Sequence, residues 1–219
     1  MADRARIAID VVSDVVCPWC FVGRQRLAKA LATLPDVEAE VRWRPFQLDS
    51  SIPPEGKDRR SYMLAKFGSE ERLRQIHANI LPLGEAEGIR FNFDAITIAP
   101  NTLDAHRVIR WALGTGGDVQ DKLVGELFSR YFERGENVGD HDVLAQAARA
   151  AGMDDAIVTS LLPTNADREE VQAEISTASR MGITGVPCFL LAGKYAVMGA
   201  QDVASLAKAI GEVARSAAA

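Results

Sequence analysis

Hydrophobic positions near the start of the chain follow a strand pattern, and those between them follow a helix pattern. Residues 6–14 are apolar or β-branched at most positions, which predicts a buried strand. Residues 37–44 alternate strictly between apolar and charged side chains, which predicts a half-buried strand. Between them, residues 21–34 carry apolar side chains at helical spacing and end at Pro35. This order predicts a right-handed βαβ unit.

A loop and then a helical block follow this unit. Residues 47–57 contain Pro53, Pro54 and Gly56 and mark the expected domain boundary. After the loop, apolar residues recur at helical spacing, and the predicted helices include 101–113, 120–134, 140–151 and 165–181.

The helix expected over residues 101–113 has a clear polar start and a broad apolar surface. Asn101 is its expected N-cap. Val108 and Trp111 lie off the main apolar stripe, so we expect burial on more than one side. The stripe itself consists of Leu103, His106, Ile109 and Leu113.

Strand character returns near the end of the chain. Residues 187–192 and 195–198 flank Gly193 and Lys194, which is typical of a hairpin, and an amphipathic helix follows from Gln201. The order βαβ, helical block, αββα predicts an α/β protein with a thioredoxin fold and an inserted all-helical domain. The expected thioredoxin-fold domain comprises residues 1–56 and 182–219, and the insertion comprises residues 57–181 with its long returning helix.

Composition narrows the class of protein. The 219 residues are 47% hydrophobic, which supports a packed core rather than disorder. The net charge of −5 gives no basic surface for nucleic acid. The apolar runs are too short to span a bilayer, and the first residues do not form a signal peptide. We therefore expect a cytoplasmic protein that binds neither membrane nor nucleic acid.

Cys17 and Cys20 form the clearest chemical motif. They follow a predicted buried strand and open a predicted helix, with Cys17 at the N-cap and Pro18 at the first helical position. Free backbone N–H groups and the helix dipole would stabilise a thiolate on Cys17, the nucleophilic form. A zinc site is the weaker reading, because zinc needs four ligands and only Cys188 and three scattered histidines remain.

Gly185, Val186 and Pro187 form a second element of the expected site. A proline at the start of a strand requires a sheet edge or a special turn. In a thioredoxin fold the turn before the third strand carries a cis-proline beside the active cysteines. We therefore expect Pro187 to be that cis-proline.

Four segments together resemble the DsbA family, in particular its cytosolic FrnE-like branch: SDVVCPWCFVG, WRPFQLD, NTLDAHR and MGITGVPCFLLAGKYAVMGAQ. The resemblance implies thiol–disulfide exchange without a bound cofactor, with Cys17 attacking and Cys20 resolving. It also implies that the backbone of Val186 pairs with a substrate chain. The implied partners are protein or small-molecule thiols and disulfides, with glutathione as a reductant or co-substrate, and the resemblance leaves a homodimer open.

Trp19 departs from the best-known periplasmic members of that family, which carry histidine at this position. An imidazolium there stabilises the thiolate and an indole does not, so we expect a weaker oxidant. The expected potential lies roughly between −150 and −250 mV, and reductase or isomerase work fits a reducing cytosol. Pro18 and Trp19 are the expected apolar contacts for substrate.

Three further residues have both a functional and a structural interpretation. Cys188 follows Pro187 directly, but a buried apolar role is favoured over that of a third active thiol. Asp14 is a candidate proton relay to Cys20, although a turn residue at the strand end is the simpler account. His106 lies on a mostly apolar helix side, where a packed or hydrogen-bonded histidine is commoner than a catalytic one.

Two other functions stay open from the sequence. Glutathione-dependent isomerases and kappa-class glutathione transferases share parts of the pattern, but they use a serine near the position of Cys17 and lack the second cysteine. A cleft between the domains that binds unfolded chains or a partner is the non-enzymatic alternative.

Overall fold

The computed structural model describes residues 4–218 and contains a four-stranded sheet in the order β2-β1-β5-β6. β1 (Ala5–Ser13) lies at its centre and pairs in parallel with β2 (Val37–Pro45). On its other side it pairs antiparallel with β5 (Cys188–Leu191), which pairs with β6 (Tyr195–Met198). A parallel pair needs a crossover connection, which α1 (Pro18–Ala32) supplies. This topology confirms the predicted α/β class and thioredoxin fold.

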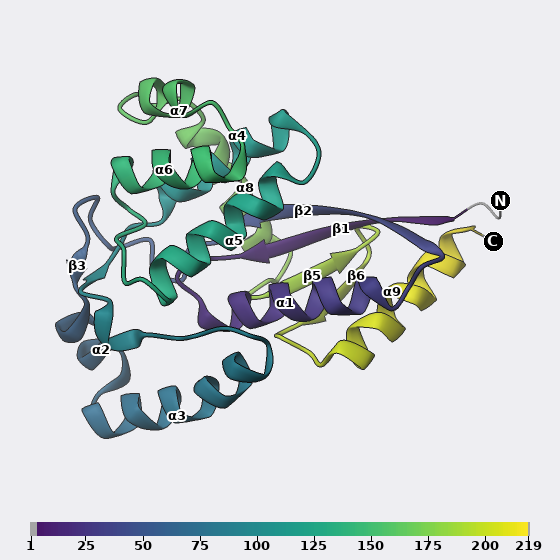
Figure 1. Cartoon of the computed structure of the whole chain (residues 1–219), viewed down its shortest axis with the longest axis horizontal. Coiled ribbons are helices and arrows are strands. Elements are labelled where there is room, and N and C mark those ends of the chain that lie inside the picture. The colour runs from purple at the N-terminus through teal and green to yellow at the C-terminus, as the bar shows by residue number, and fades with distance from the viewer. Residues whose placement is uncertain (1–3, 219) are drawn as a thin grey trace.

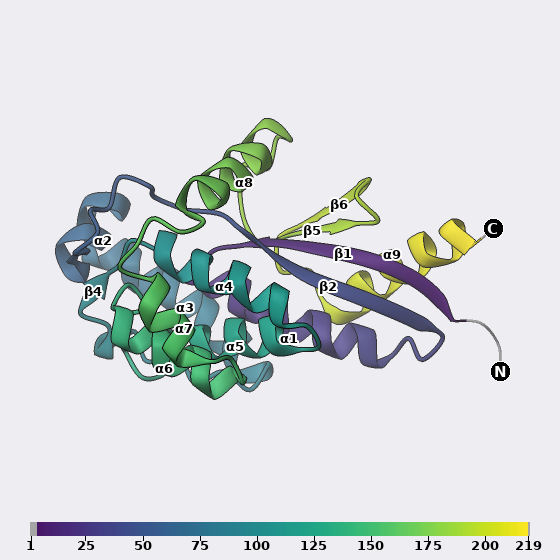
Figure 2. The same ribbon diagram turned by 90° about the horizontal axis from the view of Figure 1, so that it is seen from above.

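Helices cover both faces of the sheet. Figure 2 shows α8 (Arg168–Arg180) on one side, with α1 and α9 (Val203–Ala218) on the other. Ile9 and Val11 of β1 are completely buried between these layers, as expected for a central strand. Both ends of the described chain lie at the same end of the molecule, far from α2 (Arg59–Phe67) and α3 (Glu70–Ala86) (Figure 1).

The regular structure of the segment between the two parts of the thioredoxin fold is helical except for two short strands. Its further helices are α4 (Leu103–Thr115), α5 (Val119–Phe132), α6 (His141–Ala151) and α7 (Asp155–Leu161). A two-residue ladder joins β3 (Lys57–Asp58) to β4 (Ile98–Ala99), and a 3-10 turn spans Phe93–Ala95. The ladder was not expected from the sequence, because two-residue strands leave no periodic signal. The boundaries at residues 56/57 and 181/182 stay a prediction.

Aromatic side chains join the inserted helices to the thioredoxin fold. Phe128 of α5 stacks on Phe21 of α1 with ring centroids 5.1 Å apart, and its ring also meets Trp43 of β2 at 6.4 Å. Phe132, one turn further along α5, lies 6.2 Å from Phe21. The two parts of the chain therefore share one continuous hydrophobic core.

The predicted start of α1 is confirmed, and that of α4 needs correction. α1 begins at Pro18 with Cys17 at the N-cap, although its apolar helical pattern was clear only from residue 21. α4 begins at Leu103 with Thr102 at the N-cap position. The side chain of Asn101 still contributes, because its Oδ1 accepts a hydrogen bond from the backbone N–H of Leu103 at 2.9 Å.

The apolar surface of α4 also differs from the predicted stripe. Leu113 is 38% exposed near the end of the helix, whereas Val108 is fully buried. Burial on more than one side, expected from Val108, is therefore correct. The last predicted helix of the block begins at Arg168 rather than at residue 165, because residues 165–167 form the turn that enters α8.

Candidate active site

Cys17 is the N-cap residue of α1. Its backbone is extended, with φ −95° and ψ 112°, and its N–H donates to the carbonyl oxygen of Asp14 at 3.0 Å. Its own carbonyl oxygen accepts hydrogen bonds from the N–H groups of Cys20 at 3.0 Å and Phe21 at 3.3 Å. This geometry places the thiol at the positive end of a 15-residue helix.

The two cysteines of the motif differ in exposure. Cys17 is 4% exposed and Cys20 is completely buried, and both are free thiols. Burial raises the pKa of the Cys20 thiol well above its ordinary value, and its hydrogen bond and charge interaction with Cys17 raise the pKa further. At neutral pH Cys20 is therefore a protonated, buried thiol in the first turn of α1.

The turn before β5 lies against Cys17. The Sγ of Cys17 donates to the carbonyl oxygen of Val186 across 3.7 Å, and the peptide bond between Val186 and Pro187 is cis. Gly23 of α1 allows this close approach: a Cβ there would lie 3.0 Å from Cγ of Pro187 and 3.2 Å from Cζ of Phe189. The sequence-predicted residues of the two halves of the site are therefore neighbours in space.

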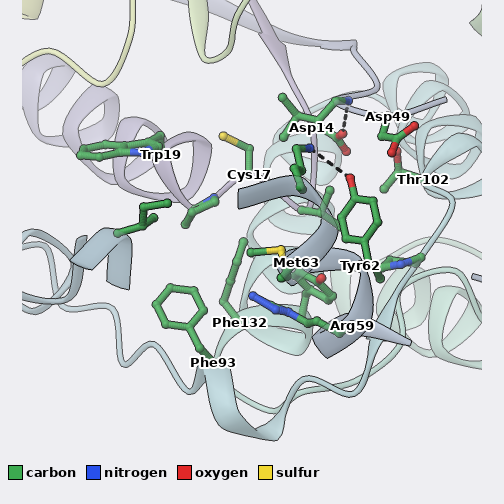
Figure 3. Close-up of a pocket in the computed structure, with 18 of the residues that line it drawn as sticks. Asp14, Cys17, Trp19, Asp49, Arg59, Tyr62, Met63, Phe93, Thr102 and Phe132 are labelled. Carbon is green, nitrogen blue, oxygen red and sulfur yellow. Dashed lines mark hydrogen bonds between the residues drawn. The ribbon is translucent and has the colours of Figure 1, made fainter. Parts of the chain in front are cut away.

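Trp19 is the exposed member of the motif. Trp19 is 39% exposed, and Pro18 beside it is half-buried. Figure 3 shows Trp19 and Cys17 on one side of a pocket, with Tyr62, Met63 and Arg59 of α2 on the opposite side. Trp19 and Pro18 thus present apolar surface at the rim of this pocket, next to the thiol.

Asp14 and His106 form a buried polar pair. The Oδ2 of Asp14 accepts from the backbone N–H of Leu48 at 2.8 Å, and its Oδ1 lies 3.6 Å from Nε2 of His106. The same Nε2 is 2.8 Å from the carbonyl oxygen of Phe46. His106 thus links α4 to the loop after β2 as a hydrogen-bonded interior residue. A backbone hydrogen bond with Asp14 lowers the pKa of Cys20, and the charge of Asp14 raises it by less.

Cys188 lies inside the sheet. It is completely buried in β5 opposite Val12 of β1, and it packs with Ala178 and Ile183. Burial raises the pKa of its thiol. Its chain neighbours Val186 and Gly185 reach the pocket, whereas Cys188 is not among the lining residues.

The pocket beside Cys17 has a volume of about 480 Å³, and apolar side chains of α2, α3, α5 and the loops around them make up much of its wall. Arg59, Tyr62 and His77 are polar residues of its wall that the sequence did not single out. The four residues from Lys57 to Arg60 are all charged, a pattern that is typical of a solvent-exposed surface. The burial of Arg59 therefore becomes visible only in the packing of α2.

Neither a metal-binding cluster nor a membrane-spanning helix is present in residues 4–218. In this part of the chain, no three His, Cys, Asp or Glu side chains gather closely enough to hold a metal ion. Of its helices, none combines the length and apolar character that crossing a membrane requires.

Comparisons with known proteins identify the family of this chain. The family model described as "DSBA-like thioredoxin domain" matches residues 8–211. The crystal structure of a probable DsbA oxidoreductase from Streptomyces coelicolor is 30% identical, with a TM-score of 0.86, over 94% of this chain and 89% of that one.

Two more distant structures share the fold. The 2-hydroxychromene-2-carboxylate isomerase is 18% identical with a TM-score of 0.69, over 96% of this chain and 98% of that chain. The cytosolic disulfide reductase DsbM from Pseudomonas aeruginosa, solved with GSH, is 15% identical with a TM-score of 0.60, over 95% and 96%. At these identities the likeness concerns the fold alone.

Proposed function

Because this chain belongs to the family of DSBA-like thioredoxin domains, we propose that it is a thiol–disulfide oxidoreductase that works through Cys17 and Cys20. One observation carries the proposal. Cys17 caps the start of α1 beside Val186, and Cys20 lies one turn behind it as a buried thiol. This is the arrangement that a nucleophilic and a resolving thiol require.

The proposed reaction transfers two electrons from the cysteines to a substrate disulfide. The thiolate of Cys17 attacks one substrate sulfur, which breaks the substrate S–S bond, forms a mixed disulfide and releases the other sulfur as a thiolate. Cys20 then loses its proton and attacks the Cys17 sulfur. The second substrate thiolate leaves, a Cys17–Cys20 disulfide forms, and the two protons pass to the released thiols.

The raised pKa of Cys20 sets the order of these steps. A protonated Cys20 does not compete with Cys17 as a nucleophile, because the thiolate is the reactive species. Attack by Cys17 removes the charge interaction between the two sulfurs, which is one of the causes of the raised pKa of Cys20. Asp14 is the proposed acceptor for the Cys20 proton, since its buried carboxylate influences that thiol.

Substrate docking is proposed at the rim that Trp19, Pro18 and Val186 form. Trp19 and Pro18 offer apolar surface beside the thiol. The half-buried Val186 precedes β5 and would add backbone hydrogen bonds to an extended substrate chain.

We also propose a cytoplasmic location with glutathione as the reductant that resets the pair. A reducing compartment favours the dithiol form that attacks disulfides. The cytosolic reductase DsbM, whose structure contains GSH, shares the fold and supports this proposal by analogy. The assignment to a FrnE-like branch stays a prediction.

The test is turnover of insulin disulfides with dithiothreitol as the reductant. Wild type is expected to accelerate the reduction, and Cys17→Ser and Cys20→Ser are each expected to lose this activity. Cys188→Ser is the matched control, because it removes a buried thiol that does not line the pocket. Full activity in Cys17→Ser would contradict the proposal.

Glutathione-dependent isomerisation is the second candidate, favoured by the apolar pocket beside Cys17 and by the fold shared with the isomerase. The same variants separate the two functions. An isomerase activity that needs glutathione and survives in Cys17→Ser, with no disulfide turnover by wild type, would favour this alternative.

A further inference from the structure

Most buried polar side-chain atoms without a partner, among residues 4–218, belong to residues that line the pocket beside Cys17. Within residues 4–218, four buried side-chain nitrogen or oxygen atoms lack a hydrogen-bond partner. Three of them belong to residues that line this pocket: Oδ1 of Asp14, Nε of Arg59 and Nε2 of His77. Buried polar groups are normally hydrogen-bonded, so such a concentration points to a ligand-binding function.

Arg59 is the most unusual of these residues. It begins α2 and is only 8% exposed, yet within the described residues its guanidinium makes neither a hydrogen bond nor an ion pair. Figure 3 shows its nitrogen atoms inside the pocket, next to Phe132 and Met63. Its Nε is buried without a partner, and a buried polar group that gains neither an anion nor a hydrogen bond is costly.

The other buried arginines of the described chain show what Arg59 lacks. Arg107 is fully buried and donates five hydrogen bonds, to the carboxylate of Asp104 and to four carbonyl oxygens. Arg130, as buried as Arg59, pairs with Glu126 and Glu136. Among the buried arginines of residues 4–218, Arg59 alone lacks a hydrogen-bond partner and lines the pocket.

The surroundings of Arg59 favour an apolar ligand with one negative group. The guanidinium lies 5.8 Å from the ring centroid of Phe93, on which the ring of His77 stacks at 4.1 Å. Burial and the charge of Arg59 lower the pKa of His77, so this histidine is a neutral hydrogen-bonding group rather than a second cation. Much of the remaining wall is aliphatic or aromatic, from Ile52, Ile76, Ile80 and Phe132.

The two carboxylates of the wall do not neutralise Arg59. Asp49 accepts hydrogen bonds from the backbone N–H and hydroxyl of Ser51, and Asp14 accepts from Leu48. Neither carboxylate forms an ion pair with Arg59 in the described structure. The wall thus carries the Cys17 thiol and two cations, Arg59, which is buried and unpaired, and Lys66, which is exposed and donates to the hydroxyl of Tyr62.

We propose that this pocket binds a small organic disulfide with an apolar ring and a carboxylate, whose carboxylate pairs with Arg59 and whose sulfur meets Cys17. The sulfur step rests on the proposed function. The bound disulfide accepts two electrons from the Cys17 and Cys20 thiols, is released as two thiols that take up two protons, and leaves a Cys17–Cys20 disulfide. A dithiol or glutathione then reduces the protein.

The experiment compares two chromogenic disulfides of opposite character. 5,5′-Dithiobis(2-nitrobenzoate) has an aromatic ring and a carboxylate on each side, and 4,4′-dithiodipyridine is aromatic and uncharged at pH 8. Arg59→Met is expected to slow the reaction of the reduced protein with the anionic disulfide about tenfold, and to change the rate with the neutral one less than about twofold. Arg59→Lys keeps the charge and is expected to fall between wild type and Arg59→Met.

Arg60→Met is the matched control. Arg60 is the next residue, is exposed and forms an ion pair with Glu70, so it carries the same charge outside the pocket. Its loss is expected to leave both rates unchanged, which separates binding in the pocket from general attraction of anions. Equal rates for wild type and Arg59→Met with the anionic disulfide, or an equal loss with both disulfides, would overturn the proposal.

A ligand without sulfur makes the pocket testable apart from the redox chemistry. By titration calorimetry, 2-naphthoate is expected to bind wild type and Arg60→Met with the same Kd, and Arg59→Met about tenfold more weakly. Binding of this pattern without any disulfide turnover would refute the proposed function and retain the anion pocket. Absence of naphthoate binding to folded wild type would overturn the pocket itself.

Discussion

The Sγ of Cys17 lies 3.7 Å from the carbonyl oxygen of Val186, a residue 169 positions further along the chain. This contact joins the start of α1 to the turn before β5, so the nucleophile and the expected substrate-pairing backbone are parts of one surface. Cys20 and Cys188 lie on the inner side of that surface. Cys17 lines the pocket, whereas Cys20 and Cys188 do not.

Alkylation is expected to distinguish the three thiols. In the native reduced protein at pH 7, iodoacetamide should modify Cys17 alone, because Cys20 and Cys188 are completely buried and burial raises the pKa of both. Mass spectrometry should find one adduct in the native protein and three after unfolding in guanidinium. A native adduct on Cys188 but not on Cys17 would contradict the assignment of the accessible thiol.

The stability of the reduced protein is expected to fall in alkaline solution. The pKa of Cys20 is raised in the folded state, so its contribution is complete below the unfolded thiol pKa of about 8.5 and is lost as pH rises towards the folded value. The unfolded state loses its proton first, which favours unfolding. Cys20 should contribute a slope of up to about 1.4 kcal/mol per pH unit in this range.

Urea unfolding of reduced wild type and Cys20→Ser between pH 7 and 10 measures this contribution. The variant should show the shallower decline, with Cys188 and the tyrosines contributing equally to both proteins. Parallel pH profiles for the two proteins would contradict the raised pKa of Cys20.

The redox potential is expected to lie roughly between −150 and −250 mV, because Trp19 supplies no positive charge to the Cys17 thiolate. Equilibration with glutathione and dithiothreitol buffers, followed by thiol labelling, gives the value. Trp19→His should shift the potential towards that of a stronger oxidant. A wild-type potential at or above about −120 mV would contradict the prediction.

Removal of the unpaired charge at Arg59 is expected to stabilise the ligand-free protein. Methionine retains most of the apolar stem and removes a buried cation, so Arg59→Met should raise the free energy of unfolding by about 1–3 kcal/mol. Thermal or urea unfolding measures the difference, with Arg60→Met as the exposed control near zero. A clear loss of stability in Arg59→Met alone would show that the charge is satisfied in the folded protein.

Much of the fold was predictable because its signals are local. The alternation in β2, the apolar run in β1 and the hairpin at Gly193 each follow from neighbouring residues. Their order along the chain indicates the thioredoxin fold, whereas the strand order in the sheet comes from the structure. Cys17 and Pro18 also carry a local signal, since a cap and a first-turn proline define a helix start. The errors concern helix ends. α4 was expected to begin next to Asn101 but begins at Leu103, whose N–H donates to the side chain of Asn101.

The parts that could not be predicted depend on tertiary packing. Arg59 and Arg60 are neighbours in a run of charged residues, yet Arg59 is buried and Arg60 is exposed. The placement of α2 beside the pocket determines which of the two is buried. The contact of His106 with Phe46 joins residues 60 positions apart without any spacing rule. Leu113 fits the helical stripe of α4 but is 38% exposed near the end of that helix.

The most direct test of the central claim uses Cys20→Ser, which lacks the resolving thiol. Incubation of the reduced variant with a disulfide-bonded peptide, followed by peptide mapping without reduction, should find one half of the substrate attached to Cys17 as a stable mixed disulfide. Wild type should release both halves and form the Cys17–Cys20 disulfide. A variant that stays unmodified, or that carries the substrate only on Cys188, would contradict the assignment of Cys17 as the attacking residue.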